Sequence, residues 1–473
     1  MKLTLRDYQN GAVRDVRAAY ADGCRAPLLT LPTGGGKTVI FSYIAERAGA
    51  KGNRVLILVH RRELLRQTSR TLDDFGVAHG MIAAGMSMDH HKHVQIASVQ
   101  TLVRRLERLR WAPDLIVVDE AHHTTSKTTW GQVLAHYQDA KILGVTATPQ
   151  RLDGQGLGVT AGGLFDKLIV GPTVAELTAE GHLSPAVVFA PRTMVDLSSI
   201  HTRAGDYAQN EVAEAMDKPT ITGDAVAHYR RHCPGEPAIA FCASVAHAEH
   251  VAASFQAAGF NAASIDGGMD SDLRAQHVAD LGARRLQVLT SCEIISEGVD
   301  IPVVSAAILL RPTQSLGLYL QQVGRVLRPA PGKTRAVILD HVGNCFRHGL
   351  PDDDREWTLQ GREKRPGAAS DAMPVRQCSE CYHVHRPAPV CPRCGHVYPV
   401  QSREVDEVEG ELEQVDVVAI RAQQKDQIKK ARTLEELEAI GRARGFKPGW
   451  AWFMFNSKQA AHQAYKTGQR RKA

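Results

Sequence analysis

The run Leu31–Thr38, with the sequence Leu-Pro-Thr-Gly-Gly-Gly-Lys-Thr, contains residue types that can bind phosphate groups. It lies between an apolar stretch, Pro27–Leu31, and a helix-like pattern, Val39–Ala48, and a phosphate-binding loop requires this strand–turn–helix setting. Consecutive glycines let backbone N–H groups surround the phosphates, Lys37 supplies a positive charge, and the Thr38 hydroxyl can ligate Mg²⁺. Leu31 replaces the first glycine of the general pattern. The loop predicts a nucleotide-binding site made of Thr33, Gly34, Gly35, Gly36, Lys37 and Thr38.

Two carboxylates, Asp119 and Glu120, come at the end of an apolar run, Leu115–Asp119. Ligands bind at the carboxyl ends of strands in open parallel sheets, so Asp119 can hold Mg²⁺ through its water shell. Glu120 is then placed to orient and deprotonate an attacking water. Alone, such a pair would be interpreted as the start of an ordinary turn. The phosphate-binding loop upstream favours the catalytic interpretation.

Arginines in the run Gln321–Arg328 could supply the positive charge that triphosphate hydrolysis requires. Arg325 and Arg328 are three residues apart and therefore lie on one face of a helix. The same spacing also suits a surface face of ion pairs, and spacing alone does not separate these two interpretations. Gln321, Arg325 and Arg328 are therefore catalytic candidates.

Four of the nine cysteines form two Cys-x-x-Cys pairs that are separated by nine residues. This spacing lets four thiolates converge on one tetrahedral Zn²⁺, and a site with four protein ligands is closed and structural. Four free thiols would be prone to oxidation, and no thioredoxin-like pattern surrounds a redox-active pair. The expected zinc ligands are Cys378, Cys381, Cys391 and Cys394.

The first 150 residues alternate short β-branched runs with helix-like patterns. The candidate strands are apolar almost throughout, as in strands covered on both faces, and their spacing leaves room for crossover helices. They are Pro27–Leu31, Arg54–His60, Val94–Ser98, Leu115–Asp119 and Ile142–Thr146. The pattern predicts a parallel α/β sheet.

A second series with the same rhythm follows a less regular stretch, Gly154–Thr222. Its candidate strands are Ala238–Cys242, Leu286–Thr290, Val304–Leu310 and Ala336–Asp340, with helical patterns such as Ala246–Ala258 between them. Two tandem α/β domains agree with a length of 473 residues, which exceeds what one core usually supports. The expected organisation is domain one at 1–172, a connector at 173–222, domain two at 223–347, a linker at 348–375, a zinc ribbon at 376–400, an acidic linker at 401–418 and a basic C-terminal module with a helical tail at 419–473.

The C-terminal module combines positive charge with aromatic residues. Residues 420–473 contain 13 Lys and Arg against 4 Asp and Glu, whereas the whole chain has a net charge of only +6. The run Gly445–Phe455 places aromatic rings among these bases. This suits a platform for stacking single strands, and it equally suits a small helical core with a basic rim. We favour the core for most of the rings, and the rim can bind DNA in that case as well.

The expected location of the chain is the cytoplasm, without a membrane partner. No stretch approaches the roughly 20 apolar residues of a membrane-spanning helix, and residues 1–10 are too polar for a secretory signal. The five other cysteines are scattered, mostly in apolar runs, as expected of thiols in a reducing compartment.

Six segments, taken together in chain order, resemble the motifs of the superfamily two helicases. They are Leu5–Gln9, Pro32–Thr38, Asp119–His122 with the sequence Asp-Glu-Ala-His, Val145–Pro149, Glu297–Asp300 and Gln321–Arg328. Arg311–Ser315 and Ala330–Asp340 are similar to the DEAH-box group that includes the RadD DNA-repair helicases and the helicase subunits of restriction enzymes. The resemblance implies two RecA-like domains that hydrolyse ATP in the cleft between them.

The resemblance also implies roles for single residues. Arg6 and Gln9 resemble the element that recognises adenine, and Gly298 and Asp300 resemble a pair that contacts both nucleotide and nucleic-acid backbone. The candidates in Gln321–Arg328 resemble a sensor and two arginine fingers. The residues that resemble nucleic-acid contacts are His60, Arg61, Gln100, Thr101, Thr146, Thr148 and Thr290.

The expected function is that of an ATP-dependent DNA helicase or translocase in DNA repair or recombination, with Mg²⁺ and Zn²⁺ as cofactors. Contacts to phosphates carry no base information, so movement is expected to be independent of sequence. The alternatives are a non-unwinding translocase subunit of a restriction or phage-defence complex, an RNA helicase, and a scaffold with a vestigial ATPase. The presence of Lys37, Glu120 and Arg328 disfavours the scaffold. Single-strand-binding, repair or defence proteins are the protein partners that these functions imply.

Overall fold

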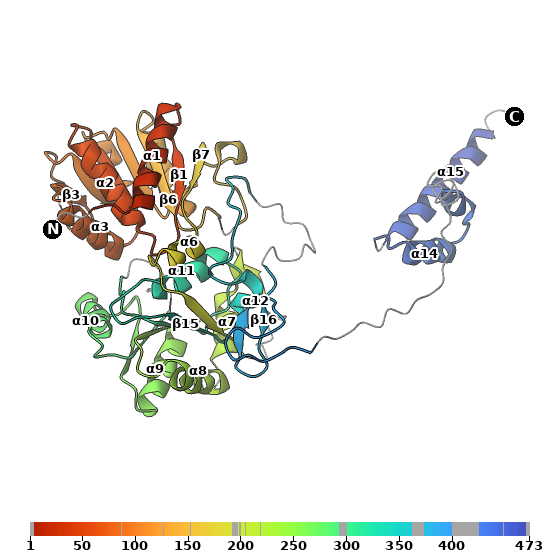
Figure 1. Cartoon of the computed structure of the whole chain (residues 1–473). Coiled ribbons are helices and arrows are strands. Elements are labelled where there is room, and N and C mark those ends of the chain that lie inside the picture. The colour runs from red at the N-terminus through yellow and green to blue at the C-terminus, as the bar shows by residue number, and fades with distance from the viewer. Residues whose placement is uncertain are drawn as a thin grey trace. The chain divides into compact units, whose positions relative to one another are not determined.

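Figure 1 shows the chain as a computed structural model. The structure describes residues 4–469, except 87, 126, 152, 192–196, 198–199, 204, 218, 293–299, 362–372, 400–424 and 448. The chain divides into two compact units, Met1–Tyr398 and Pro399–Ala473. The first unit contains two large sheets, each of which forms the centre of a lobe.

The N-terminal lobe is built on a parallel sheet that, within the described residues, has the strand order β3-β4-β2-β5-β6-β1-β7. The strands are β1 (Pro27–Thr30), β2 (Val55–Val59), β3 (His79–Ile82), β4 (Val94–Ser98), β5 (Leu115–Asp119), β6 (Lys141–Thr146) and β7 (Lys167–Val170). The five strands expected from apolar runs are confirmed. The two strands that were not predicted, β3 and β7, lie at the sheet edges, where partial exposure interrupts the apolar run.

Helices cover both faces of this first sheet. One face packs against α1 (Asp7–Ala21), α2 (Lys37–Gly49) and α3 (Arg62–Asp74), and the other packs against α4 (Val99–Leu102) and α5 (Thr129–His136). Alternate strand residues enter opposite cores, so Ile57 lies in the first core whereas Leu56 and Leu58 lie in the second. The central strands are apolar throughout because both of their faces are buried. The 3₁₀ turns of this lobe are η1 (Leu106–Arg108), η2 (Ala121–His123) and η3 (Val159–Ala161).

The second lobe is built on a sheet with the order β12-β13-β11-β14-β15-β8-β17-β16 among the described residues. Its strands are β8 (Ala186–Phe189), β11 (Ala238–Phe241), β12 (Ala262–Ile265), β13 (Val288–Ser291), β14 (Ala306–Leu309), β15 (Ala336–Asp340), β16 (Arg376–Gln377) and β17 (His383–His385). The pairs from β12 to β8 are parallel, and β17 is antiparallel to both β8 and β16. The four predicted strands of this series are confirmed as β11, β13, β14 and β15.

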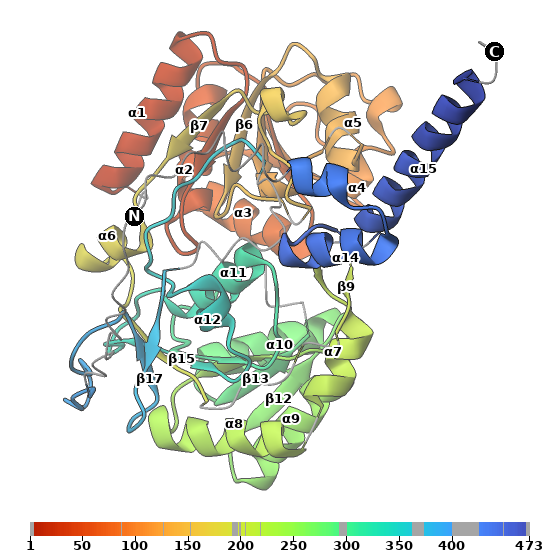
Figure 2. The ribbon, with the colours of Figure 1, turned by 90° about the vertical axis from the view of Figure 1, so that its right-hand side faces the viewer.

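Helices also cover both faces of the second sheet. α8 (Pro219–His232) and α9 (Val245–Ala257) pack on one face, and α7 (Gln209–Met216), α10 (Ser271–Gly282) and α11 (Leu316–Val326) pack on the other. The remaining helices are α6 (Val174–Ala179) and α12 (Asn344–His348), and a small hairpin is formed by β9 (Thr202–Arg203) and β10 (Asp206–Tyr207). α11 lies at the junction of the two lobes (Figures 1 and 2).

The predicted connector and the zinc ribbon both contribute strands to the second sheet. β8, which lies within 173–222, pairs with β15, and β17 of the ribbon places Val384 opposite Val188 of β8. Val384 is buried in the core of this lobe. The ribbon therefore extends the second lobe and is not a module of its own. Strands as short as β16 and β17 have no periodicity that the sequence could reveal.

Residues 349–361, within the predicted linker, form a strap that runs from the second lobe to the first (cyan in Figure 2). The backbone carbonyl of Leu359 accepts hydrogen bonds from the N–H groups of Leu157 and Gly158, both at 2.9 Å. Gln360 donates to the Thr160 hydroxyl at 2.7 Å, and the Leu359 side chain packs against the core of the first lobe. At the other end, Arg355 donates to four backbone carbonyls of residues 348–353. The strap thus belongs to both lobes.

The second unit contains a short helical segment at 425–430, α14 (Leu434–Ala443) and α15 (Trp450–Gln469). α14 and α15 pack against each other around Leu437, which is wholly buried. The expectation that most aromatic rings of Gly445–Phe455 form a core is wrong. Three of the five rings are exposed, by 41% for Phe446, 64% for Trp452 and 68% for Phe453. So small a unit has too little interior to enclose them.

The acidic segment 401–418 lies outside the described residues. In the part of the chain that the structure describes, no helix is both long enough and apolar enough to cross a membrane.

Candidate functional site

A cavity of about 360 Å³ lies between the two lobes, beside the carboxyl ends of β1 and β5. Residues of both lobes line it, including Arg6, Gln9, Thr33, Gly34, Gly36, Lys37, Thr38, Asp119 and Glu120 from the first lobe and Asp300, Arg325 and Arg328 from the second. The structure therefore brings together most of the residues predicted for the nucleotide site. Gly298, which was predicted to join them, lies outside the described residues.

The predicted phosphate-binding loop occupies the turn between β1 and α2. Gly36 caps α2 with a φ of 78°, a left-handed conformation that glycine adopts without strain. A Cβ atom at Gly36 would also overlap the side-chain amide of Gln9. The first N–H groups of α2 have no partner within the helix, so the loop presents donors and a positive helix end to an anion.

The first turn of α1 contacts this loop. Tyr8 donates a hydrogen bond from its hydroxyl to the Gly35 carbonyl at 3.0 Å. The side-chain oxygen of Gln9 accepts a hydrogen bond from the backbone N–H of Arg6 at 2.9 Å, which caps the start of α1. The predicted adenine-recognition residues Arg6 and Gln9 are thus held at the edge of the cavity by local capping and by contact with the loop.

Asp119 and Glu120 follow β5, as expected. The Glu120 backbone has a φ of 50°, and its N–H donates to Asp119 Oδ1 at 3.0 Å. Glu120 Oε2 lies 3.5 Å from His122 Nδ1, and the same nitrogen lies 2.9 Å from the Thr146 hydroxyl. Thr146 in turn bonds to both backbone groups of Thr148. A continuous polar chain therefore links the carboxylate in the cavity to the end of β6.

Helix α11 carries the arginines of the second lobe to the cavity. A Cβ atom at Gly324 would overlap the side chain of Thr33, so this glycine permits α11 to approach the phosphate-binding loop closely. Arg325 is buried, and Arg328 forms an ion pair with Asp300 at 2.6 Å. Both arginines line the same cavity as the loop. Gln321, the third catalytic candidate of this run, does not line this cavity and lies instead at a larger groove described below.

The charges around Lys37 depend on one another. Burial lowers the pKa of the Lys37 ammonium, Glu120 and Asp119 oppose this effect, and Arg325 and Arg328 add to it. The Lys37 ammonium donates to the Leu31 carbonyl at 3.3 Å. Three cations of the two lobes therefore face two carboxylates, an arrangement that a polyanionic ligand bound with a divalent cation would neutralise.

Two residues of this site were not singled out from the sequence. The rings of Tyr8 and His182 lie 5.2 Å apart, and His182 lines the cavity. Tyr8 belongs to the Leu5–Gln9 segment, so its place in that segment was a usable signal. His182 lies in the irregular stretch before β8, and only tertiary folding brings it to the loop.

A larger groove of about 900 Å³ also lies between the lobes. It is lined by Arg61, His122, His123, Thr148 and Gln150 from the first lobe and by the β9–β10 hairpin, Arg311, Ser315, Gly317, Leu318 and Gln321 from the second. Arg61 and Thr148, two of the residues predicted to contact nucleic acid, are therefore at this groove. His122 lies at both the groove and the polar chain that starts at Glu120.

The β9–β10 hairpin is fastened to the segment Arg311–Ser315. The Asp206 carboxylate accepts hydrogen bonds from the Thr313 hydroxyl at 2.8 Å and from the Gln314 N–H at 2.7 Å. Gln314 also donates to the Thr202 hydroxyl at 3.0 Å. These hydrogen bonds to Arg311–Ser315 thus hold the hairpin in place beside the groove.

The other predicted nucleic-acid contacts have different settings. His60 lies with its ring 5.2 Å from that of His123, and Gln100 and Thr101 lie on α4 at the carboxyl end of β4, with Gln100 exposed. Thr146 and Thr290 are wholly buried. The Thr290 hydroxyl donates to the Ala248 carbonyl at 2.7 Å inside the second lobe. Both hydroxyls make their hydrogen bonds inside their own lobes, and the contact of Thr146 and Thr290 with nucleic acid stays a prediction.

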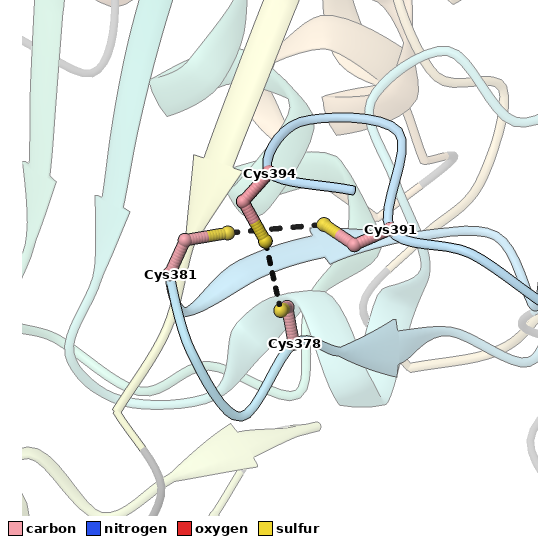
Figure 3. A group of neighbouring side chains, drawn as sticks. All are labelled: Cys378, Cys381, Cys391 and Cys394. Carbon is pink, nitrogen blue, oxygen red and sulfur yellow. Dashed lines mark hydrogen bonds between the residues drawn. The ribbon is translucent and has the colours of Figure 1, made fainter. Parts of the chain in front are cut away.

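The four clustered cysteines converge in the ribbon (Figure 3). All four sulfur atoms lie within 4.8 Å of one another, with Cys378 and Cys394 at 3.5 Å and Cys381 and Cys391 at 3.8 Å. Thiolates that surround a zinc ion at about 2.3 Å in a tetrahedron lie about 3.8 Å apart. Both knuckles turn in the same way, since the N–H groups of Tyr382 and Gly395 bond to the carbonyls of the first cysteines. The donor set and its spacing fit a structural Zn²⁺.

Each lobe matches the model of a protein family. Residues 2–151 match the family described as "Type III restriction enzyme, res subunit", and residues 222–330 match the family described as "Helicase conserved C-terminal domain". The two matched ranges contain all the described lining residues of the interlobe cavity except His182.

The chain is also similar to individual proteins along most of its length. The chain is 34% identical to a "51.5 kDa protein" of Lactococcus phage (isolate 7-9), with 82% of each chain covered. It is 29% identical to IRC3 of Saccharomyces cerevisiae, provisionally named an ATP-dependent helicase, over 72% of this chain and 51% of that protein. It is 24% identical to the "Type I restriction enzyme EcoAI endonuclease subunit" of Escherichia coli, over 71% of this chain and 46% of that subunit.

Among solved structures, a fragment of a type I restriction enzyme HsdR subunit from Vibrio vulnificus YJ016 has a similar fold. The TM-score is 0.57 at 21% identity, with 72% of this chain and 64% of the other covered.

Proposed function

The chain belongs to the superfamily 2 helicases, which are ATP-hydrolysing enzymes, and from that premise we propose that it is a motor that moves along or unwinds DNA. One observation carries the proposal: a single cavity contains the phosphate-binding loop of the first lobe and two arginines of the second. Hydrolysis in such a cavity depends on the approach of the lobes, so it can be coupled to their motion.

In the proposed reaction, the triphosphate of ATP lies at the N-terminus of α2 beside Lys37. Thr38 and Asp119 are the residues that would hold Mg²⁺, which neutralises charge on the β- and γ-phosphates when bound. Glu120 accepts a proton from the attacking water as its oxygen bonds to the γ-phosphorus. The bond to the bridging oxygen breaks, ADP keeps the electron pair, and inorganic phosphate leaves. Arg325 and Arg328 stabilise the negative charge that develops.

Coupling to nucleic acid is proposed to run through the polar chain from Glu120 to Thr148. This chain starts at the nucleotide cavity and ends at the larger groove, with His122 between them. ATP favours the closed arrangement because it contacts both lobes, and hydrolysis removes that preference. We place the nucleic-acid backbone in the larger groove, where Arg61 and the β9–β10 hairpin face each other across it.

DNA is the proposed track because relatives of this chain are named as subunits of restriction enzymes, which are DNA-directed. A role in repair or recombination rests on the similarity of Arg311–Ser315 and Ala330–Asp340 to the RadD group. The second candidate is a translocase subunit of a restriction or phage-defence complex, and the match of residues 2–151 to a restriction subunit family favours it. An RNA-directed helicase is the third candidate.

The four cysteines are proposed to bind one structural Zn²⁺ that fixes the fold of the ribbon. The site has four protein sulfurs, which leaves no coordination position for a substrate. The ribbon then contributes to the rigidity of the second lobe through β17, and not to the chemistry of hydrolysis.

The decisive experiment measures ATP hydrolysis without polymer and with single-stranded DNA, duplex DNA, forked DNA and RNA. We expect DNA to stimulate turnover, and we expect Glu120→Gln to reduce the stimulated kcat by about 10²–10⁴-fold while ATP still binds. Displacement of a labelled strand from the fork distinguishes a helicase from a translocase. Equal turnover by Glu120→Gln and the wild type would refute the mechanism, and stimulation by RNA alone would refute the DNA track.

A further inference from the structure

The end of the chain is unusual in charge and in aromatic content. Residues 439–473 contain eight Lys and Arg and no Asp or Glu. The same 35 residues contain six of the aromatic Phe, Trp and Tyr side chains of the chain, namely Phe446, Trp450, Trp452, Phe453, Phe455 and Tyr465. The acidic residues of this unit that the structure describes precede α15: Asp426 forms an ion pair with Lys430 at 2.7 Å, and Glu435, Glu436 and Glu438 lie in the first turns of α14.

Some aromatic rings of the unit pack within it, and others do not. Trp450 packs on the backbone of Gly441, 3.3 Å from where a Cβ atom would be, and its ring lies 4.5 Å from that of Phe446. This contact fastens the start of α15 to α14. Trp452 and Phe453 make no ring contact within the described residues and are 64% and 68% exposed. They are the most exposed aromatic side chains in that part of the chain.

The exposed rings lie on a stripe of α15 without charge. The exposed positions of the first turns are 452, 453, 456, 457 and 459, occupied by Trp452, Phe453, Asn456, Ser457 and Gln459. Lys458, on the opposite side, donates to backbone carbonyls of Lys429 and Ala431 and is therefore engaged in the fold. The bases of α14 and of the turn after it supply the positive surroundings, with Arg442 and Lys447 exposed.

Two adjacent exposed rings on a helix that has no acidic residue match the chemistry of single-stranded nucleic acid. Every base has a flat π-face that can stack on an aromatic ring, and a basic surface attracts the phosphates. We propose that the pair Trp452 and Phe453, which we call the aromatic pair, is a stacking site for unpaired bases, separate from the interlobe groove. A lipid surface would also accept a basic helix with exposed rings. The choice of nucleic acid over lipid rests on the proposed function of the motor.

This second site adds to the motor a contact that does not depend on ATP. The chain then binds a strand at two places, and each contact raises the effective concentration of the strand at the other. The contact with bases is tolerant of sequence because stacking does not read base edges. The aromatic pair therefore retains the strand while the lobes release it during each cycle of hydrolysis.

The test uses the full-length protein without nucleotide and a fluorescein-labelled oligo(dT), with an oligo(U) arm to compare DNA with RNA. We expect Trp452→Ala combined with Phe453→Ala to raise the Kd about tenfold, since one stacked base contributes about 1–3 kcal/mol. Trp452→Phe should bind nearly as tightly as the wild type, because phenylalanine still stacks. Asn456→Ala, at an exposed position of the same helix, is the matched control and should not change the Kd.

Tryptophan fluorescence gives a second readout for the same site. Trp111 and Trp130 are buried and Trp357 and Trp450 are partly buried, so only the part of the quenching on oligo(dT) binding that Trp452→Phe removes reports on Trp452. An unchanged Kd in the double variant, or quenching that is as large in Trp452→Phe as in the wild type, would overturn the proposal. Loss of binding to anionic phospholipid vesicles, with oligonucleotide binding intact, would assign the aromatic pair to a membrane surface and also overturn it.

The two proposals fail in different ways. If the motor assignment is wrong, the wild type shows no stimulation of ATP hydrolysis by any polymer, whatever the Kd of the double variant. If only the aromatic pair is wrongly assigned, stimulation is present and the double variant needs no more oligo(dT) than the wild type to reach half of it. With a correct assignment, the double variant keeps its maximal kcat and needs about tenfold more oligo(dT).

Discussion

Glu120, which lines the nucleotide cavity, has a strained backbone conformation. Its left-handed conformation costs a non-glycine residue about 1–3 kcal/mol, and the φ of 50° is set by the turn between β5 and η2. Its Oε2 atom is buried, and its contact with His122 Nδ1 at 3.5 Å lacks hydrogen-bond geometry. A buried oxygen in this state is strongly stabilised when a water that enters the cavity donates a hydrogen bond to it, or when it takes up a proton. The sequence could predict the carboxylate but not the backbone conformation, because the latter depends on the folded turn.

The two arginines of α11 are expected to affect hydrolysis more than nucleotide binding. Arg325→Ala should reduce kcat about 10³-fold, the lower end of the effect of an arginine that stabilises the transferred phosphoryl group. ATP affinity, measured by the binding of a fluorescent analogue, should change much less. Arg335→Ala, at an exposed position of the same lobe, is the control. Equal losses in kcat and in affinity would assign Arg325 to ground-state binding instead.

Arg328 should differ from Arg325 because it has a second role. It forms an ion pair with Asp300 at 2.6 Å within the cavity. Arg328→Ala therefore leaves an uncompensated carboxylate beside the phosphates, and it should weaken ATP binding as well as reduce kcat. Arg328→Ala with Asp300→Asn should recover part of the affinity but not of the kcat. If the double variant recovers neither, the ion pair is not the cause of the weakened binding.

His348 of helix α12 should make the stability of the second lobe decrease at acidic pH. Burial lowers the pKa of His348 to about 4, its ring stacks 5.4 Å from that of Tyr319, and Nε2 donates to the Thr313 carbonyl at 2.9 Å. In the unfolded chain a histidine titrates near 6.5, so between pH 6.5 and 4 only the unfolded chain binds the proton. The stabilising contribution is complete above pH 6.5 and is lost as the pH falls towards 4.

This pH dependence is measurable by urea unfolding between pH 7 and pH 5. One such group changes the free energy of unfolding by at most about 1.4 kcal/mol per pH unit. His348→Gln should make the decrease shallower, because glutamine does not titrate and can still donate to the Thr313 carbonyl. His91→Gln, at an exposed loop position, should leave the slope unchanged. A slope that is the same in His348→Gln as in the wild type would contradict the prediction.

Zinc binding to the ribbon should stabilise the sheet of the second lobe. β17 pairs with β8, and Val384 lies in the core of the second lobe, so unfolding of the ribbon exposes an edge of that sheet. Cys391→Ser should reduce zinc to well under one equivalent and lower the thermal midpoint of the second lobe. Cys24→Ser, which changes a cysteine of the first lobe, should keep the metal. A full equivalent of zinc in Cys391→Ser would show that the four sulfurs are not the ligands.

Most of the fold and much of the site could be predicted because their signals are local. Central strands such as Val55–Val59 are buried on both faces, and Cys378 and Cys381 have the spacing that zinc requires. Contacts between distant segments could not be predicted in this way. His182 reaches the phosphate-binding loop only because Leu177 of α6 and Leu183 fold against the glycines of that loop. Residues 349–361 have no periodicity, because their backbone bonds to a loop and not to a regular element.

The strap of residues 349–361 gives the molecule a second connection between its lobes, besides the contact of α11 with the loop. We expect Leu359→Asp to loosen it, since a carboxylate would replace a side chain that packs against the core of the first lobe. The amides of Leu157 and Gly158, which donate to the Leu359 carbonyl, should then exchange with solvent faster. Glu356→Ala, at an exposed position of the strap, is the control.

A loosened strap should also weaken ATP binding, although no strap residue lines the nucleotide cavity. Closure of the lobes brings Arg325 and Arg328 to the loop, and apparent affinity decreases in proportion to the fraction of molecules in the closed arrangement. We therefore expect the half-saturating ATP concentration of Leu359→Asp to rise several-fold at an unchanged maximal kcat. Faster amide exchange with unchanged half-saturation would mean that the strap only covers the first lobe. In that case α11 and the Glu63–Arg274 ion pair, at 3.0 Å across the lobes, would suffice to hold them together.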